Sequence, residues 1–301
     1  MEVISKAGYF ILLIALGYFL KKIKLLKRSD ADILGKIVAN VTLPCVFFAS
    51  ASRITVSTDM IGYMGIGLMA NVSMVLIAYV FSKKRSSIMK GTYMIACSGY
   101  DVGNFVLPFV TAFLTNEAVW YLTSFNVASI LMCMGITYAL ACSLAQVDSG
   151  FTLQRFGRNL LKSLSFDVYL VILILGMLQI RIPEAAVNLA DNIGSANTFL
   201  VMVMIGLKID LRMKGPEWKD TLQILGIRLA GALVLTALTW LLPIPRLAKV
   251  VLAMIYFGPL TSVSSIYAKE AGYEGNVVAN ANILSIFLSI AVSSICILWL
   301  L

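Results

Sequence analysis

Long apolar runs recur along the whole chain of 301 residues, and only short polar breaks separate them. An α-helix needs about 20 mostly apolar residues to span the hydrocarbon core of a bilayer. Only 13% of the residues are charged, whereas a soluble domain averages about 25%. We therefore expect an all-α polytopic membrane protein that is surrounded by the lipid bilayer and has no sizeable water-soluble domain.

The apolar runs predict ten transmembrane helices. They cover approximately 3–21, 31–52, 60–82, 87–114, 117–145, 166–182, 187–209, 219–242, 246–270 and 275–300. Most of the 24 Lys and Arg residues fall in the loops that follow the odd-numbered segments. Basic loops are retained in the cytoplasm, so this bias predicts that both termini lie outside. We expect a multi-pass protein of a bacterial cytoplasmic membrane.

Composition also excludes several classes of function. The net charge is +9, but the basic residues cluster in short connectors, so topology explains them and no nucleic-acid partner is expected. The chain has no histidine, which excludes Ser-His-Asp catalysis and histidine metal sites. Its five cysteines lie in apolar segments without a CxxC pair, as small buried side chains do. We expect no catalytic residue, no metal and no cofactor other than a coupling ion.

Two of the predicted spans carry polar interruptions. The stretch GYDVGNFVLP, residues 99–108, brings an aspartate, an asparagine, two glycines and a proline into the fourth span. The stretch GPLTSVSS, residues 258–265, interrupts the ninth span in the same way. Non-helical backbone at this depth is tolerated where it is buried in protein or lines a wet cavity. The less specific alternative is that Gly and Pro merely kink these helices.

The two interruptions occupy corresponding places in the two halves of the chain. Gly103 and Gly258 are separated by the same offset as the stretches 40–44 and 195–199. Ten spans divide into two sets of five, and an odd number per set inverts the second set in the membrane. We predict two inverted five-helix repeats, 1–147 and 166–301, joined by a cytoplasmic connector at 148–165, with crossed broken helices 4 and 9.

Paired interruptions of this kind are the best sequence indicator of a transporter binding site. The N-terminus of each half-helix suits an anion, and its C-terminal carbonyls suit a cation. We expect the substrate to be bound by polar residues at and beside the interruptions: Asn40, Thr42, Gly103, Asn104, Asn126, Thr261, Ser262, Ser264 and Ser265. The alternatives are hydroxyl bonds to the preceding helical turn and hydrogen bonds between helices, including Asn197 and Thr198 opposite Asn40 and Thr42.

Two ionisable residues fall inside predicted spans near the interruptions. Asp101 is the acidic residue expected closest to the membrane centre, and a group there is a functional candidate by default. With no histidine available, Asp101 is the candidate site for coupling to H⁺ or Na⁺, and a purely structural carboxylate is the alternative. Arg228 in the eighth span is expected to extend toward the cytoplasmic interface. Balancing Asp101 and attracting an anion are its alternative roles.

The sequence resembles the auxin efflux carrier family, which includes plant PIN-type carriers and bacterial organic-anion permeases. Residues 17–50 resemble that family's first loop and second span, and the stretch around Gly103 and Pro108 is similar to its first crossover. Pro259, followed by the run IYAKE at 266–270, resembles the second crossover. The chain departs from the family at Asp101-Val102, where Asn-Thr/Ser is usual, and at Phe199, where proline is usual.

The resemblance implies a scaffold of helices 1, 2, 6 and 7 and a mobile transport domain of helices 3–5 and 8–10. It also implies an elevator-type alternating-access mechanism, a homodimer through the scaffold, and a small organic anion as substrate, such as a mono- or dicarboxylate or an auxin-like compound. Asp101 leaves the coupling ion open between H⁺ and Na⁺.

Several other functions compete with this interpretation. A sodium-coupled symporter of the bile-acid type and a cation/proton antiporter share the fold class, although the antiporter usually needs paired core carboxylates. A channel suits paired interruptions less well than alternating access does. GYD at 99–101 resembles half the signature of intramembrane aspartyl proteases, but that chemistry needs a second carboxylate, and no Gly-x-Gly-Asp motif occurs in the chain.

Overall fold

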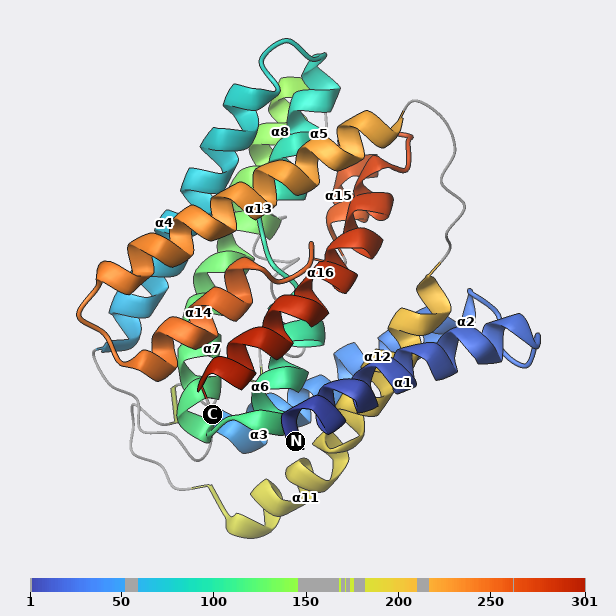
Figure 1. Ribbon diagram of the computed structural model, residues 1–301, viewed down its shortest axis with the longest axis vertical. Helices are drawn as coiled ribbons and strands as arrows, with labels where there is room; N and C mark the ends of the chain where they lie inside the picture. Colours follow the sequence, from blue (N-terminus) through green and yellow to red (C-terminus); the bar gives the residue numbers. More distant parts are fainter. Residues whose placement is uncertain are drawn as a thin grey trace. The chain divides into compact units, whose positions relative to one another are not determined.

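The computed structural model describes residues 2–51, 59–145, 168, 171, 174–175, 182–209, 217–261 and 263–300. All regular secondary structure in these ranges is helical, which confirms the all-α prediction (Figure 1). The predicted connector at 148–165 lies outside the described residues, and the sixth predicted span is described at only a few positions.

Five helices in the described part of the chain are long and apolar enough to cross a membrane. They are Met60–Phe81, Asn116–Ala145, Glu184–Lys208, Glu217–Leu241 and Val277–Trp299. Each coincides with one of the ten predicted spans. The fourth and ninth predicted spans are absent from this set because each is divided into two shorter helices. A membrane-embedded all-helical chain is therefore supported, and the count of ten stays a prediction.

The helices separate into two compact units, here called unit 1 and unit 2. Unit 1 contains α1 (Glu2–Lys22), α2 (Asp30–Ile37), the π-helical turn η1 (Val38–Thr42), α3 (Leu43–Ala51), α6 (Leu107–Phe113), α11 (Glu184–Gly194) and α12 (Ala196–Lys208). In unit 1, α1 packs along α12 and α3 packs against α11. The α1–α12 contact is close because Gly17 and Gly206 face each other: a Cβ added at Gly17 would lie 3.1 Å from the Gly206 Cα.

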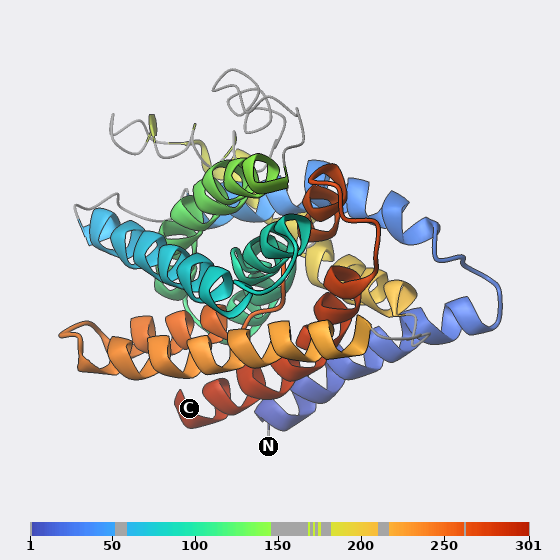
Figure 2. The same cartoon turned by 90° about the horizontal axis from the view of Figure 1, so that it is seen from above.

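Unit 2 contains the other described helices and an extensive apolar core. It consists of α4 (Asp59–Phe81), α5 (Ser87–Cys97), most of α7 (Asn116–Leu131), the π-helical η3 (Met132–Thr137), α8 (Tyr138–Ala145), α13 (Glu217–Leu241), α14 (Arg246–Tyr256), α15 (Ser264–Glu270) and α16 (Val277–Leu300). Helix α13 is continuous (Figure 2) and packs against α4, α5, α14 and α16. Its buried face, which includes Ile224 and Ile227, joins side chains of α4, α5 and α16 in one core.

Both helices that the sequence predicts to be interrupted are interrupted in the structure. Helix α5 ends at Cys97, and the chain runs through four non-helical residues before the π-helical η2 (Val102–Val106) leads into α6. Helix α14 ends at Tyr256, and α15 begins only at Ser264 (Figure 1). The boundary between the units falls inside η2, because Val102 belongs to unit 2 and Gly103 to unit 1.

Candidate functional site

The first interruption, residues 98–101, begins where α5 ends. Ser98 leaves the helix with extended backbone angles, and Gly99 follows with a φ of 79°, a conformation that glycine adopts without strain. A side chain at Gly99 would also lie only 2.8 Å from the sulfur of Cys133. Asn71 of α4 holds this turn, because its side-chain oxygen accepts a hydrogen bond of 2.9 Å from the Gly99 N–H.

The second interruption, residues 257–263, is supported by α16. Pro259 has no N–H to donate, so it cannot continue the hydrogen-bond ladder of α14. The Leu260 N–H donates instead to the hydroxyl of Ser285 at 3.2 Å. That hydroxyl in turn donates to the carbonyl of Asn282 at 2.7 Å. Helix α16 thus supplies a polar partner to backbone that the break leaves unpaired.

The two interruptions are directly bonded to each other. The Asp101 N–H donates to the Pro259 carbonyl at 2.9 Å. A second link comes from Ser264, whose hydroxyl lies 3.4 Å from the Ile95 carbonyl of α5. Two breaks that are far apart in sequence therefore form one polar centre inside unit 2.

Arg228 of α13 reaches this centre, contrary to the expectation that it extends to the interface. Its side chain is 5% exposed, and its guanidinium donates to four backbone carbonyls. Nη1 lies 3.1, 3.2 and 3.1 Å from the oxygens of Ala96, Cys97 and Gly99, and Nη2 lies 2.9 Å from that of Gly258. The expectation was wrong because the carbonyls freed at two helix ends can replace the solvation that the interface would have provided.

Aromatic rings border the same centre. The Arg228 guanidinium carbon lies 5.0 Å from the centroid of the Tyr100 ring, within the range of a cation–π interaction. The Tyr100 ring in turn contacts the rings of Phe125 and Tyr256. The Tyr100 hydroxyl is buried and has no hydrogen-bond partner among the described residues. Asp101, the predicted coupling residue, is also buried, with 8% of its surface exposed.

The predicted substrate-binding residues are only partly brought together. Thr261 is half-buried at the second interruption, Ser264 is buried and Ser265 half-buried at the start of α15, and Ser262 lies outside the described residues. Asn126 is half-buried on α7, one residue after Phe125. These residues belong to unit 2.

The other predicted residues lie in η2 and in the second span. Gly103 and Asn104 are half-buried in η2, on the unit 1 side of the boundary. Asn40 is exposed, and its side-chain nitrogen donates to the Lys36 carbonyl one turn earlier at 2.8 Å. Thr42 is buried, and its hydroxyl donates to the side-chain oxygen of Asn197 at 2.8 Å. This Thr42–Asn197 bond corresponds to the alternative role of hydrogen bonding between helices.

Sequence reasoning missed Asn71, Ser285 and Ser289, which bond to the backbone of the breaks. The serines carried a usable signal, because Ser285, Ser289 and Ser293 are spaced by four residues and therefore lie on one helix face. All three are buried. Asn71 carried no such signal, since a single asparagine in an apolar helix does not identify its partner.

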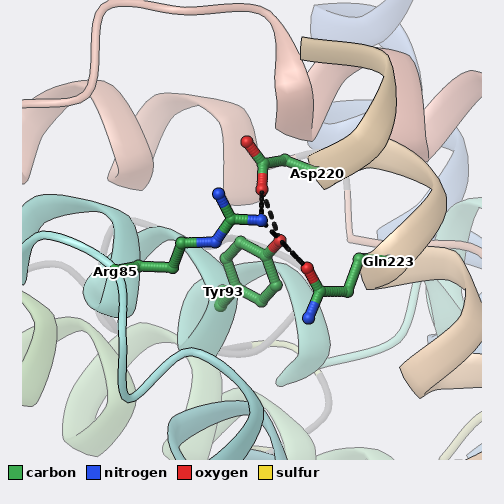
Figure 3. A network of polar contacts seen from close by, with 4 residues as sticks. All are labelled: Arg85, Tyr93, Asp220 and Gln223. Carbon is green, nitrogen blue, oxygen red and sulfur yellow. Dashed lines mark hydrogen bonds and ion pairs between the residues drawn. The ribbon is translucent and has the colours of Figure 1, made fainter. Parts of the chain in front are cut away.

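A second polar cluster joins α5 to α13 and to the loop before α5. The Tyr93 hydroxyl lies 2.7 Å from an oxygen of Asp220 and 2.9 Å from the side-chain oxygen of Gln223 (Figure 3). Arg85 forms a 2.7 Å ion pair with the same Asp220 oxygen. The polar groups of these residues bond to one another, so we interpret the cluster as a structural contact that holds α5 to α13.

Comparison with known proteins supports a transporter. Residues 4–150 match a protein family described as membrane transport protein, which confirms the resemblance to the auxin efflux carrier family noted above. An uncharacterized transporter of Methanothermobacter thermautotrophicus is 22% identical to this chain over 288 residues, which cover 93% of this chain and 92% of the relative. Both matches concern transporters, which favours a carrier over an intramembrane protease.

Proposed function

We propose that this protein is a secondary active transporter of a small organic anion. The proposal starts from the match of residues 4–150 to a membrane transport protein family. The substrate is a mono- or dicarboxylate or an auxin-like compound, carried by an elevator-type alternating-access mechanism. Asp101 couples transport to H⁺ or Na⁺. The observation that carries the proposal is the direct bond between two helix interruptions, Asp101 N–H to Pro259 C=O.

Two interrupted helices that meet are typical of transporters whose substrate binds near the middle of the bilayer. The guanidinium of Arg228 donates to carbonyls of both interruptions at this centre. The choice of an organic anion as substrate rests on the resemblance to the auxin efflux carrier family. Asp101, a buried carboxylate of the first interruption, supplies a group that can exchange a proton.

The proposal assigns different roles to the two units. Unit 1 holds the first, second and seventh predicted spans and corresponds to the scaffold, through which a homodimer would form. Unit 2 corresponds to the transport domain. Residues 103–120 are grouped with unit 1, whereas the simple division by spans puts them in the transport domain. Ten helices in two inverted repeats, crossing at the interruptions, and both termini outside a bacterial cytoplasmic membrane complete the proposed arrangement.

The test is a ligand screen on the purified protein in detergent. Monocarboxylates, dicarboxylates, indole acids and amino acids are added at two pH values, and Tm is measured. A ligand that binds the folded state raises Tm by mass action. We expect at least one organic anion to do so and to be taken up by proteoliposomes. A protein stabilised by cations alone, with no response to any carboxylate, would be an antiporter instead.

The coupling role of Asp101 is tested with Asp101→Asn, which keeps the shape of the side chain. We expect the variant to keep its fold and to lose the dependence of uptake on pH or Na⁺ that the natural protein has. Uptake that responds to pH and Na⁺ in the same way in both proteins removes this role from Asp101.

A further inference from the structure

We propose that Arg228 is a built-in cation that permanently occupies the carbonyl cluster at the two helix interruptions, so that Na⁺ is excluded from this position and transport does not depend on Na⁺. The inference rests on the proposed function, since it selects between the two coupling ions left open there. It concerns the ion at the carbonyl cluster, here defined as the oxygens of Ala96, Cys97, Gly99 and Gly258.

The carbonyl cluster has the composition of a cation site. In transporters with interrupted helices, unwound backbone carbonyls and the C-terminal ends of half-helices coordinate Na⁺ or the coupling proton. Here three oxygens come from the end of α5 and the turn after it, and the fourth comes from the turn after α14. Two broken helices thus contribute to one set of ligands, and the guanidinium lies at its centre.

The charges balance without an added ion. The C-terminal end of a helix carries an effective charge of roughly −0.5, so two such ends together present roughly −1. The single positive charge of Arg228 compensates this amount. A Na⁺ ion placed against the same oxygens would lie beside a like charge in buried surroundings, where repulsion is weakly screened. Arg228 therefore excludes Na⁺ both by volume and by charge.

The geometry of the guanidinium fits permanent occupation of the carbonyl cluster. Both terminal nitrogens donate to carbonyls at 2.9–3.2 Å, and Tyr100 covers the group with its ring at 5.0 Å. A planar group with donors in a fixed fork can serve four oxygens from two segments at once, which an ammonium group does less well. A coupling proton would be taken by Asp101.

The experiment compares cations and needs no substrate in its first arm. Tm of the purified natural protein is measured in chloride salts of Na⁺, K⁺ and N-methylglucamine at equal ionic strength. The same series is run on Arg228→Ala, which empties the carbonyl cluster, and on Arg228→Lys, which keeps the charge. Arg246→Ala is the matched control, because Arg246 is an exposed arginine of α14 that contacts the Trp299 ring, away from the interruptions.

For the natural protein, for Arg228→Lys and for Arg246→Ala, we expect a Tm that does not change from one salt to another. Arg228→Ala should have a lower Tm that rises with the concentration of Na⁺ or K⁺ but not of N-methylglucamine, because a small cation then occupies the vacated oxygens. A Tm of the natural protein that rises with Na⁺ but not with K⁺ overturns the inference. This arm decides the question even if Arg228→Ala does not fold.

The second arm measures uptake of the stabilising organic anion by proteoliposomes with and without Na⁺. We expect equal uptake in Na⁺ and in K⁺. Uptake that requires Na⁺ contradicts the role given to Arg228 while leaving the carrier function intact. Absence of uptake of any organic anion, together with a Tm indifferent to Na⁺, contradicts the proposed substrate class and supports the exclusion of Na⁺.

Discussion

The close contact of α1 and α12 in unit 1 gives a quantitative prediction for Gly17→Ala. A Cβ at Gly17 would lie 3.0 Å from the carbonyl carbon of Val203 and 3.1 Å from the Gly206 Cα. Because these obstacles are backbone atoms of the partner helix, no side chain can rotate away, and the two helices must move apart. Small residues at such contacts are a common means of helix association in membranes, where van der Waals packing replaces the hydrophobic effect.

The cost follows from two opposing terms. Overpacking in a well-packed interior costs about 1–3 kcal/mol. The same substitution at an open helical position gains up to about 1 kcal/mol, because alanine favours the helix over glycine. Gly8 of the same helix provides that open position, since no described atom lies within 4 Å of a Cβ built there. Both variants share the helix-propensity gain, so their free energies of unfolding should differ by the overpacking cost alone, about 1–3 kcal/mol.

The assay is thermal unfolding in detergent, followed by the fluorescence of the four tryptophans. We expect Gly17→Ala to unfold at a lower temperature than the natural protein and Gly8→Ala to unfold at the same temperature or higher. Gly206→Ala should behave like Gly17→Ala, because its Cβ would lie 2.8 Å from the Tyr18 backbone nitrogen. A Gly17→Ala variant as stable as Gly8→Ala would refute the close approach of α1 and α12.

Three further substitutions test the polar contacts, each by its effect on Tm. Thr42→Val should lower Tm, with a cost of about 1–3 kcal/mol, because it leaves the buried Asn197 oxygen without its donor, and Thr42→Ser should restore most of the loss. Asn71→Leu should cost a similar amount, because the Gly99 N–H loses its acceptor, and an unchanged Tm would contradict that contact. Tyr100→Phe should leave Tm unchanged or raise it, because the hydroxyl it removes is buried without a partner in the described structure. A fall in uptake at unchanged Tm would assign that hydroxyl to substrate binding.

The sequence was sufficient for the features that depend on local chemistry. Apolar length predicted the helices, and the glycines and prolines at 99–108 and 258–265 predicted where two of them break. The contacts between segments were less accessible. Asn40 and Thr42 were predicted to line one cavity, yet residues two apart on a helix face different sides, and only Thr42 is buried.

Arg228 marks the second limit of sequence reasoning. An arginine in a membrane-spanning helix normally extends its side chain to the water interface, and nothing in α13 itself indicates other partners for its charge. The carbonyls that accept its hydrogen bonds lie about 130 residues earlier and 30 residues later in the chain. Their availability follows from the two breaks, so the position of Arg228 becomes predictable only once both breaks are known to meet.

The pair of attachments between α5 and α13 has a mechanical consequence. Asp220 and Gln223 hold α13 to Tyr93, and Arg228 binds the end of α5 about 8–12 Å further along the α13 axis, by the rise of the helix. A helix attached to its neighbour at one point can rotate about that point, whereas a helix attached at two points cannot tilt or slide without breaking one set of hydrogen bonds. The interruption that follows α5 is thereby held by the continuous helix α13, and its conformation can persist when the surrounding helices move.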